Sequence, residues 1–258
     1  FELSKEIGDN DLSAELNRCV GIVMMNKGCF DEALDYYKKH MNYFLKEKNK
    51  LQLATISGNI GLIHFHQGKL DESYKFFEKQ YQICKELDSK QLLQHALGNM
   101  ALIDNIKGEY KSAIAKFDDI LTICEDINDI ISISNTLGNI GIAYKNIGEY
   151  DMAIKQYEMQ LLVAKKSQLN RHICSANTNM GVSYYHKGDF KKSYDCYKKS
   201  EQIVVKISDK NEESMLYGNK GMLFFDMGKL DDALIEYEKS YEIFSSLNNI
   251  RGQALINF

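Results

Sequence analysis

Residues 137–157 decide the fold, and their sequence is LGNIGIAYKNIGEYDMAIKQY. Gly148, near the middle of this stretch, recurs at intervals of 40 residues, as Gly28, Gly68, Gly108, Gly188 and Gly228. The fifth residue after each of these glycines is Ala or Ser, and the ninth is Tyr or Phe. The seventh residue before each of them is Gly or Ala. A fixed period of this length indicates an array of stacked supersecondary units.

Each unit is predicted to contain two helices. After the glycine at position 68, apolar residues recur at helical spacing, at Leu70, Tyr74, Phe77 and Tyr81. We expect this glycine to end the first helix, because glycine enters the left-handed region of backbone space freely. In four units an aspartate begins the second helix, where a carboxylate suits the unpaired N–H groups. These aspartates are Asp31, Asp71, Asp151 and Asp231.

The composition is that of a soluble, well-packed protein. The chain has 258 residues, of which 44% are hydrophobic and 26% charged, and it contains no proline, which favours uninterrupted helices. With 36 acidic against 32 basic residues the net charge is −4, which argues against nucleic acid or an anionic membrane surface as the main partner. No stretch approaches the roughly 18 consecutive apolar residues of a membrane span, so no membrane insertion is expected.

Six cysteines are present, and none forms a C-x-x-C pair or lies near histidines at metal-ligand spacing. Cys84 and Cys124 fall in a column of the repeat that is otherwise apolar, so we expect them to be small core side chains. All six are expected to be free thiols, because a chain of this size can build its own core. No metal or cofactor is predicted, and the expected location is cytoplasmic.

The unit resembles the tetratricopeptide repeat, whose pattern is W-x-x-L-G-x-x-Y, then A-x-x-x-F, then P. The matching residues within 137–157 are Leu137, Ile140, Gly141, Tyr144, Ala153 and Tyr157. No unit has the tryptophan or the closing proline, and the period is 40 residues where the family has roughly 34. The longer unit is similar to those of kinesin light chains, the Pins/LGN polarity adaptors and bacterial Rap-type peptide receptors. This resemblance implies an all-α, right-handed α-α superhelix of antiparallel helix pairs, which binds linear peptides or partner helices and is not a catalyst.

The period divides the chain into a single array. Residues 1–8 are expected to be the end of a preceding repeat and residues 249–258 the start of a further, truncated one, so that the natural protein extends beyond both ends. The six complete repeats are predicted at residues 9–48, 49–88, 89–128, 129–168, 169–208 and 209–248.

The first helices carry a column of asparagines on the side expected to line the concave groove. Its members are Asn59, Asn99, Asn139, Asn179 and Asn219, and four of the five follow a glycine. Asparagine and glycine are both poor residues for a helix interior, so their repetition needs a reason. One interpretation is a ladder of amides that hydrogen-bond the backbone of a bound segment. The other is that each asparagine ties adjacent helices together and the glycine permits close packing.

Further groove residues are predicted beside this ladder, because an apolar strip with a polar edge is what a docked peptide requires. The candidate anchors are Phe65, Tyr185 and Phe225, and the candidate polar edge is formed by His66, Asn146 and His186. The two histidines occupy one column but lie three units apart, which is too distant for a shared metal.

Catalytic motifs are absent from the sequence: it contains no G-x-x-x-x-G-K-[ST], G-x-G-x-x-G, H-E-x-x-H or G-x-S-x-G. We therefore expect a non-catalytic scaffold that holds a protein or peptide partner in its concave groove. Two alternatives stay open. The repeats could be the regulatory or sensor region of a larger signalling protein, with a kinase or cyclase output domain, or they could be a receptor for a short signalling peptide.

Overall fold

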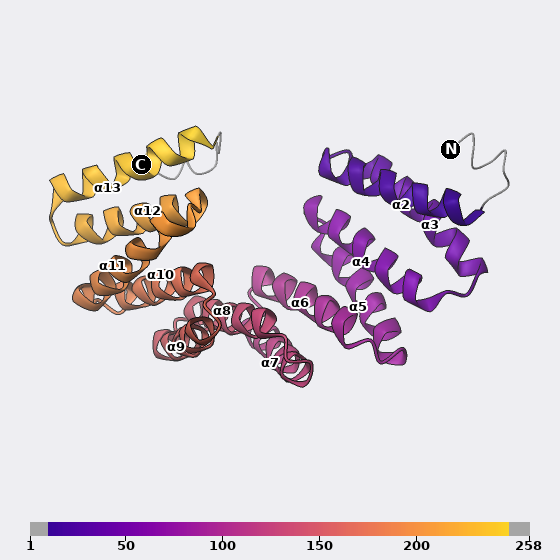
Figure 1. Cartoon of the computed structure of the whole chain (residues 1–258), viewed down its shortest axis with the longest axis horizontal. Coiled ribbons are helices and arrows are strands. Elements are labelled where there is room, and N and C mark those ends of the chain that lie inside the picture. The colour runs from indigo at the N-terminus through magenta and orange to yellow at the C-terminus, as the bar shows by residue number, and fades with distance from the viewer. Residues whose placement is uncertain (1–9, 248–258) are drawn as a thin grey trace. The chain divides into compact units, whose positions relative to one another are not determined.

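The computed structural model describes residues 10–247, and within this range every regular element is an α-helix (Figure 1). The predicted all-α fold of paired helices is confirmed. The helices are α2 (Asn10–Asn26), α3 (Phe30–Lys46), α4 (Lys50–His66), α5 (Leu70–Glu86), α6 (Lys90–Lys107), α7 (Tyr110–Asp126), α8 (Ile130–Ile147), α9 (Tyr150–Lys166), α10 (Asn170–His186), α11 (Phe190–Ile207), α12 (Lys210–Asp226) and α13 (Leu230–Ser246).

Two kinds of left-handed turn separate these helices. The glycines that mark the period end the first helices with φ between 73° and 93°, as predicted. At Gly108, for example, the N–H groups of Gly108 and Glu109 donate to the carbonyls of Asn105 and Asp104, at 3.2 and 2.8 Å. The second helices end differently, at a non-glycine residue with φ between 50° and 57°. These residues, whose conformation was not predicted, are Lys48, Asp88, Asn128, Gln168 and Ser208.

The chain forms two compact units, one ending at Ile123 and the other beginning at Cys124. In the first unit α2 pairs with α3 and α4 with α5, while α6 contacts both α4 and α5. In the second unit the pairs are α8 with α9, α10 with α11, and α12 with α13, and α10 also contacts α8, α9 and α12. The first helices α4 and α6 are therefore neighbours in the first unit, as are α8, α10 and α12 in the second, so successive asparagines within one unit lie on adjacent helices.

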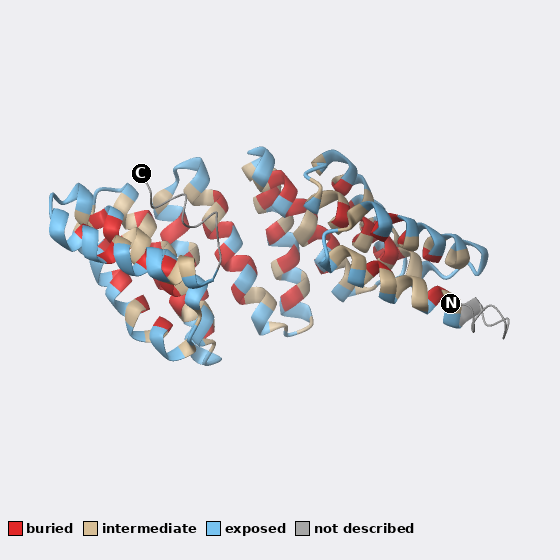
Figure 2. Cartoon of the chain, turned by 90° about the horizontal axis from the view of Figure 1, so that it is seen from above, coloured by how far each residue is buried: buried red, intermediate tan, exposed pale blue. Residues whose placement is uncertain are grey.

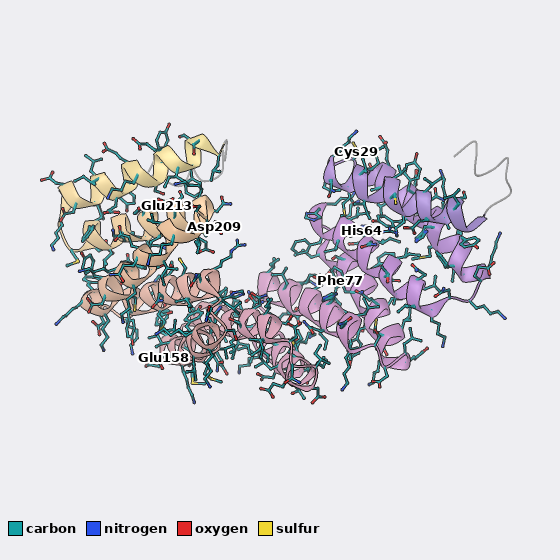
Figure 3. The ribbon with its side chains drawn as sticks, in the orientation of Figure 1. Cys29, His64, Phe77, Glu158, Asp209 and Glu213 are labelled. Atoms are coloured by element: carbon teal, nitrogen blue, oxygen red, sulfur yellow. The ribbon has the colours of Figure 1, made fainter. Side chains whose placement is uncertain are left out.

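A glycine facing an aromatic ring sets the distance between the two helices of a pair. Tyr197 in α11 fills the space beside Gly181 in α10, where an added Cβ would lie 2.3 Å from the ring. Phe77 in α5, labelled in Figure 3, contacts Gly61 in α4 in the same way. Both rings are almost completely buried, and Figure 2 shows buried residues gathered where helices face one another. The Gly or Ala seven residues before each marker glycine thus permits the two helices of a pair to cross closely.

A second contact between paired helices explains two of the four glycines that precede an asparagine, Gly58 and Gly138. A Cβ at Gly58 would lie 2.7 Å from the amide of Gln80 on the paired helix. Thr178, the exception in this column, faces the smaller Ser200, and their hydroxyl oxygens are 2.7 Å apart in a hydrogen bond. A glutamine on the paired helix therefore gives Gly58 and Gly138 a packing reason independent of any ligand. Gly98 and Gly218 lack this reason, because a Cβ there would lie 3.8 Å from Ile120 and 3.4 Å from the small Ser240.

All six cysteines are free, and four of them are buried. Cys84 and Cys124 are 0% exposed, so the prediction that they are core side chains is confirmed. Burial, together with the nearby carboxylates of Asp129 and Glu125, raises the pKa of the Cys124 thiol to about 11. These two thiols are therefore inert packing groups at neutral pH.

Replacing Gly181 by Ala should destabilise the protein by roughly 1–3 kcal/mol, because the new methyl group would overlap the ring of Tyr197. Gly98→Ala is the matched control, since its Cβ would lie 3.8 Å from Ile120 Cδ1 in an ordinary contact. The control should be neutral or stabilising by up to about 1 kcal/mol, because alanine is the better helix former. Urea unfolding followed by circular dichroism measures both changes, and equal effects would contradict the packing argument.

Gly108→Val should lower stability by more than about 1 kcal/mol, because its φ of 81° is strained for a β-branched residue. An added Cβ there meets nothing within 4 Å, so the loss reports backbone conformation alone. Glu109→Val places the same side chain one residue later, outside the left-handed region, and serves as the control. Thermal unfolding should show a lowered or broadened transition for Gly108→Val. A wild-type melting curve for this variant would refute the role of Gly108 as a helix terminator.

Candidate functional site

The asparagine ladder lies on the first helices, with side chains that reach solvent. Asn139 is exposed, and the other four members are half-buried. Within the described residues, no hydrogen bond joins any of the five amides to a neighbouring helix. Asn179 Nδ2 does lie 3.5 Å from Ser175 Oγ, but that hydroxyl belongs to its own helix. The amide donors and acceptors of the ladder are therefore available to a ligand.

In the second unit two members of the ladder share a pocket of about 360 Å³. Asn139 enters it from α8 and Asn179 from α10, helices that contact each other. The pocket is mostly polar, and besides these two amides its lining includes Asn135, Gln160, Arg171, His172, Ser175 and Glu212. The predicted groove residues Asn139 and Asn179 are thus brought together, along with several polar side chains that the sequence analysis did not single out.

Gln160 contributes a buried acceptor to this pocket. Its side chain is 3% exposed, and its Oε1 has no hydrogen-bond partner within the described residues. Gly138, directly before Asn139, makes room for it, because a Cβ there would lie 2.8 Å from Gln160 Nε2. A buried carbonyl oxygen without a donor is costly, so a ligand N–H that reached it would gain binding energy. The sequence signal was the pairing of Gly138 with Gln160, which recurs in one other repeat, at Gly58 and Gln80.

Charged groups occupy the α10–α12 side of the pocket. Arg171 Nε pairs with Asp209 Oδ2 at 3.2 Å, and Figure 3 labels Asp209 at the start of α12. His172 Nε2 lies 2.8 Å from Asn135 Oδ1 on α8. Burial and the Arg171 guanidinium lower the pKa of His172. Burial and the carboxylate of Asp209 raise the pKa of Glu212, against the opposing effect of Arg171. The pocket therefore offers uncharged amides and, at pH 7, a neutral His172 ring, with Arg171 and Glu212 beside them.

The predicted aromatic anchors lie at different depths. Phe225 is 58% exposed, whereas Phe65 and Tyr185 are half-buried. The Tyr185 hydroxyl donates to Asp226 Oδ2, and its ring stacks on Phe190 at 5.9 Å between centroids. None of the three lines the pocket of Asn139 and Asn179.

Of the three residues of the predicted polar edge, His66 and His186 stack on aromatic rings and Asn146 is exposed. His66 stacks on Phe30 of the preceding pair, with centroids 6.0 Å apart and rings within 3° of parallel. His186 stacks in the same way on Tyr150, at 5.4 Å and 10°. Both histidines are therefore contacts between successive helix pairs, while Asn146 is exposed.

The described part of the chain contains neither a cluster of metal-ligating side chains nor a membrane-spanning helix. Between residues 10 and 247 no cluster of three His, Cys, Asp or Glu side chains could hold a metal ion. Over the same residues, no helix has the length and apolar character needed to span a membrane.

Stacked helix pairs with a polar pocket on their first helices define a class, that of helical-repeat scaffolds for protein interactions. A tetratricopeptide repeat profile matches residues 52–126 and 171–246, and a second tetratricopeptide repeat profile matches residues 136–171. Because the first profile alone covers more than half of the 258 residues, the chain belongs to the tetratricopeptide repeat family.

Solved structures share this fold at low sequence identity. Aspartyl phosphate phosphatase F from Bacillus subtilis is 16% identical with a TM-score of 0.80, over 99% of this chain and 71% of that one. A signal transduction ATPase with a tetratricopeptide repeat sensor, from Pyrococcus horikoshii, is 16% identical with a TM-score of 0.78, over 100% and 40%. A Rap protein complexed with competence and sporulation factor is 13% identical with a TM-score of 0.67, over 99% and 77%. Among curated proteins, none is significantly similar in sequence.

The lowered pKa of His172 can be measured by NMR titration of its ring. We expect a midpoint below 6.5, because burial and Arg171 both disfavour the protonated ring. Since the folded state then binds the proton less readily than the unfolded state, the contribution of His172 to stability is present above pH 6.5 and is lost as the pH falls through that value. A midpoint at or above 6.5 would contradict a buried, neutral imidazole in this pocket.

Proposed function

We propose that the chain binds an extended peptide segment of a partner protein, and that the asparagine ladder hydrogen-bonds the backbone of that segment. The observation that carries the proposal is the pocket in which the amides of Asn139 and Asn179 have no partner on a neighbouring helix. An amide carries both donors and acceptors, as a peptide group does, so it can pair with backbone whatever the side chains are.

The spacing of the helices suits this role. Packed helices lie about 8–10 Å apart, and three residues of extended chain span about 10 Å. Asn139 and Asn179, on adjacent first helices, can therefore meet the same face of an extended segment at every third residue. Gln160 Oε1, which is buried without a donor, is suited to accept an N–H between them. We assign the same role to Asn219 in this unit and to Asn59 and Asn99 in the first unit.

A receptor for a signalling factor is the second candidate. It is supported by the structure of the Rap protein complexed with competence and sporulation factor, whose fold matches over 99% of this chain. The sensor repeats of the signal transduction ATPase support the related possibility of a regulatory region. In the receptor and in the regulatory region alike, the asparagine ladder would bind an extended segment, and the two candidates differ in where that segment comes from.

The test begins with peptides selected from a random displayed library on the immobilised protein. Their Kd is then measured by calorimetry on the wild type and on the Asn139→Ala/Asn179→Ala variant. The loss of two neutral hydrogen bonds should weaken binding about 5- to 150-fold. N-methylation of the contacted backbone amides should weaken binding similarly. The variant should melt at or above the wild-type temperature, because alanine is the better helix former.

Asn170→Ala is the matched control, because Asn170 is an exposed residue of α10 that does not line the pocket. It should leave the affinity unchanged. If no peptide is selected, or if selected peptides bind the double variant as tightly as the wild type, the proposal is wrong. A melting temperature well below that of the wild type would instead assign the asparagines to helix packing.

A further inference from the structure

A second pocket, of about 470 Å³, lies in the same unit and is lined by residues of α11, α12 and α13 and of the turn between α12 and α13. Figure 1 labels these three helices. Its apolar walls include Phe190, Tyr194, Phe224 and Ile235. The rings of Tyr194 and Phe224 are 5.8 Å apart between centroids. No residue lines both this pocket and the one that contains the asparagines. Its volume is in the range of small-molecule and side-chain pockets.

At three other junctions between successive helix pairs, a polar contact occupies the corresponding position. In this contact, a residue at the end of the first helix of one pair binds an aspartate near the start of the second helix of the pair before it. The three contacts are Gln67 with Asp31 (3.1 Å), Lys107 with Asp71 (2.5 Å) and Lys187 with Asp151. At a fourth junction Lys111 and Ile147 stand at these positions and cannot pair. Between α11 and α12 the residues at these positions are Lys191 and Met227, which cannot pair. Both line the pocket, so it opens where this contact is missing.

The pocket also contains charges where the preceding repeat has apolar core. Lys220 and Glu236 are 5% and 7% exposed, and their counterparts 40 residues earlier are the buried Met180 and Cys196. Lys220 Nζ donates to Glu236 Oε1 at 3.1 Å and to Glu201 Oε1 at 2.8 Å. Burying such a pair carries a large desolvation penalty, and apolar residues of similar size generally stabilise a fold as well or better. The charges therefore indicate a role other than folding.

One oxygen of this buried network lacks a partner. Glu236 Oε1 accepts from Lys220 and from Lys239, the latter at 3.2 Å. Glu236 Oε2 is buried and accepts no hydrogen bond within the described residues. A ligand with an N–H or O–H donor would satisfy it.

The remaining charges of the lining restrict what that donor can be. Apart from the Lys220–Glu236 pair, the lining carries two positive charges, Lys191 and Lys229, and one negative charge, Asp232. This net positive charge disfavours an arginine or lysine side chain as the ligand. Lys229 Nζ also lies 5.8 Å from the centroid of the Phe224 ring. A neutral donor flanked by carboxylates fits these charges. Tryptophan and tyrosine combine a large apolar ring with an N–H or O–H at its edge, and both are frequent anchors at interfaces.

We propose that this pocket binds a tryptophan or tyrosine side chain from an acidic segment of a partner protein. The ring packs against Phe190, Tyr194 and Phe224, and its polar hydrogen is donated to Glu236 Oε2. Acidic residues beside the anchor pair with Lys191 and Lys229. This site is separate from the asparagine ladder and does not depend on it.

The probe is acetyl-Glu-Trp-Glu-amide. Because the chain contains no tryptophan, the emission of the probe reports its binding directly. We expect a saturable blue shift on titration with the protein. Acetyl-Glu-Phe-Glu-amide, which lacks the donor, and acetyl-Lys-Trp-Lys-amide, which reverses the charge, should each compete at least about tenfold less well than the unlabelled tyrosine peptide acetyl-Glu-Tyr-Glu-amide. These comparisons use the wild-type protein, so no variant has to fold.

Two variants locate the site. Lys191→Asp/Met227→Lys recreates the contact made by Asp151 and Lys187 and should weaken probe binding at least about tenfold. Lys220→Met/Glu236→Cys installs the residues of the preceding repeat, and should melt at or above the wild-type temperature while losing the probe. Asn139→Ala/Asn179→Ala should bind the probe like the wild type. The proposal is overturned if the probe shows no saturable shift, if the phenylalanine peptide competes equally, or if the Lys191→Asp/Met227→Lys variant binds unchanged.

Discussion

The contact between a helix-interior glycine and an aromatic ring on the paired helix is the constraint on which this structure depends. An aromatic side chain buries a large apolar area, about 150–250 Å², and it fits between two paired helices where the opposite helix offers a glycine or alanine. Gly181 offers that surface to Tyr197, and Gly61 offers it to Phe77. A glycine or alanine recurs at this position every 40 residues, so the two helices of each pair can cross at the same place. Within each unit, the side chains available for binding follow from that repeated pairing.

The two pockets of the second unit arise from this framework in opposite ways. The asparagine pocket uses columns that the repeats keep, since Asn139 and Asn179 occupy one column and Gly138 recurs in most units. The second pocket is built from departures, since Lys220 and Glu236 replace apolar core residues. A repeat protein can therefore bind generically through its regular positions and selectively through its irregular ones. The regular positions meet a backbone, and the irregular ones meet a particular side chain.

The fold could be predicted because it rests on period and residue size, which a sequence displays directly. The marker glycines and the aromatic column determined helix ends and helix pairing, and both agree with the structure. The site was predicted less completely. The assignment of His66 and His186 to a groove edge stays a prediction, and the stacking of each on an aromatic ring of the preceding pair was not foreseen. Gln160 was missed because its pairing with Gly138 recurs in only one other repeat, and Arg171 was missed because no motif in the sequence marks its place in the pocket.

Contacts inside a helix pair join two residues of the same repeat, whereas contacts between pairs join residues of two different repeats. Gly58 and Gln80 belong to the same pair, as do Thr178 and Ser200, so each match is inherited whole when a repeat is duplicated. The Lys107–Asp71 contact, by contrast, joins two pairs and requires a suitable residue on each side. Repeats of this chain are thus interchangeable in their interiors but not at their junctions. Recombination that moved the α12–α13 pair behind a different predecessor would leave that pair's interior packing intact and would erase the pocket at its junction with α11.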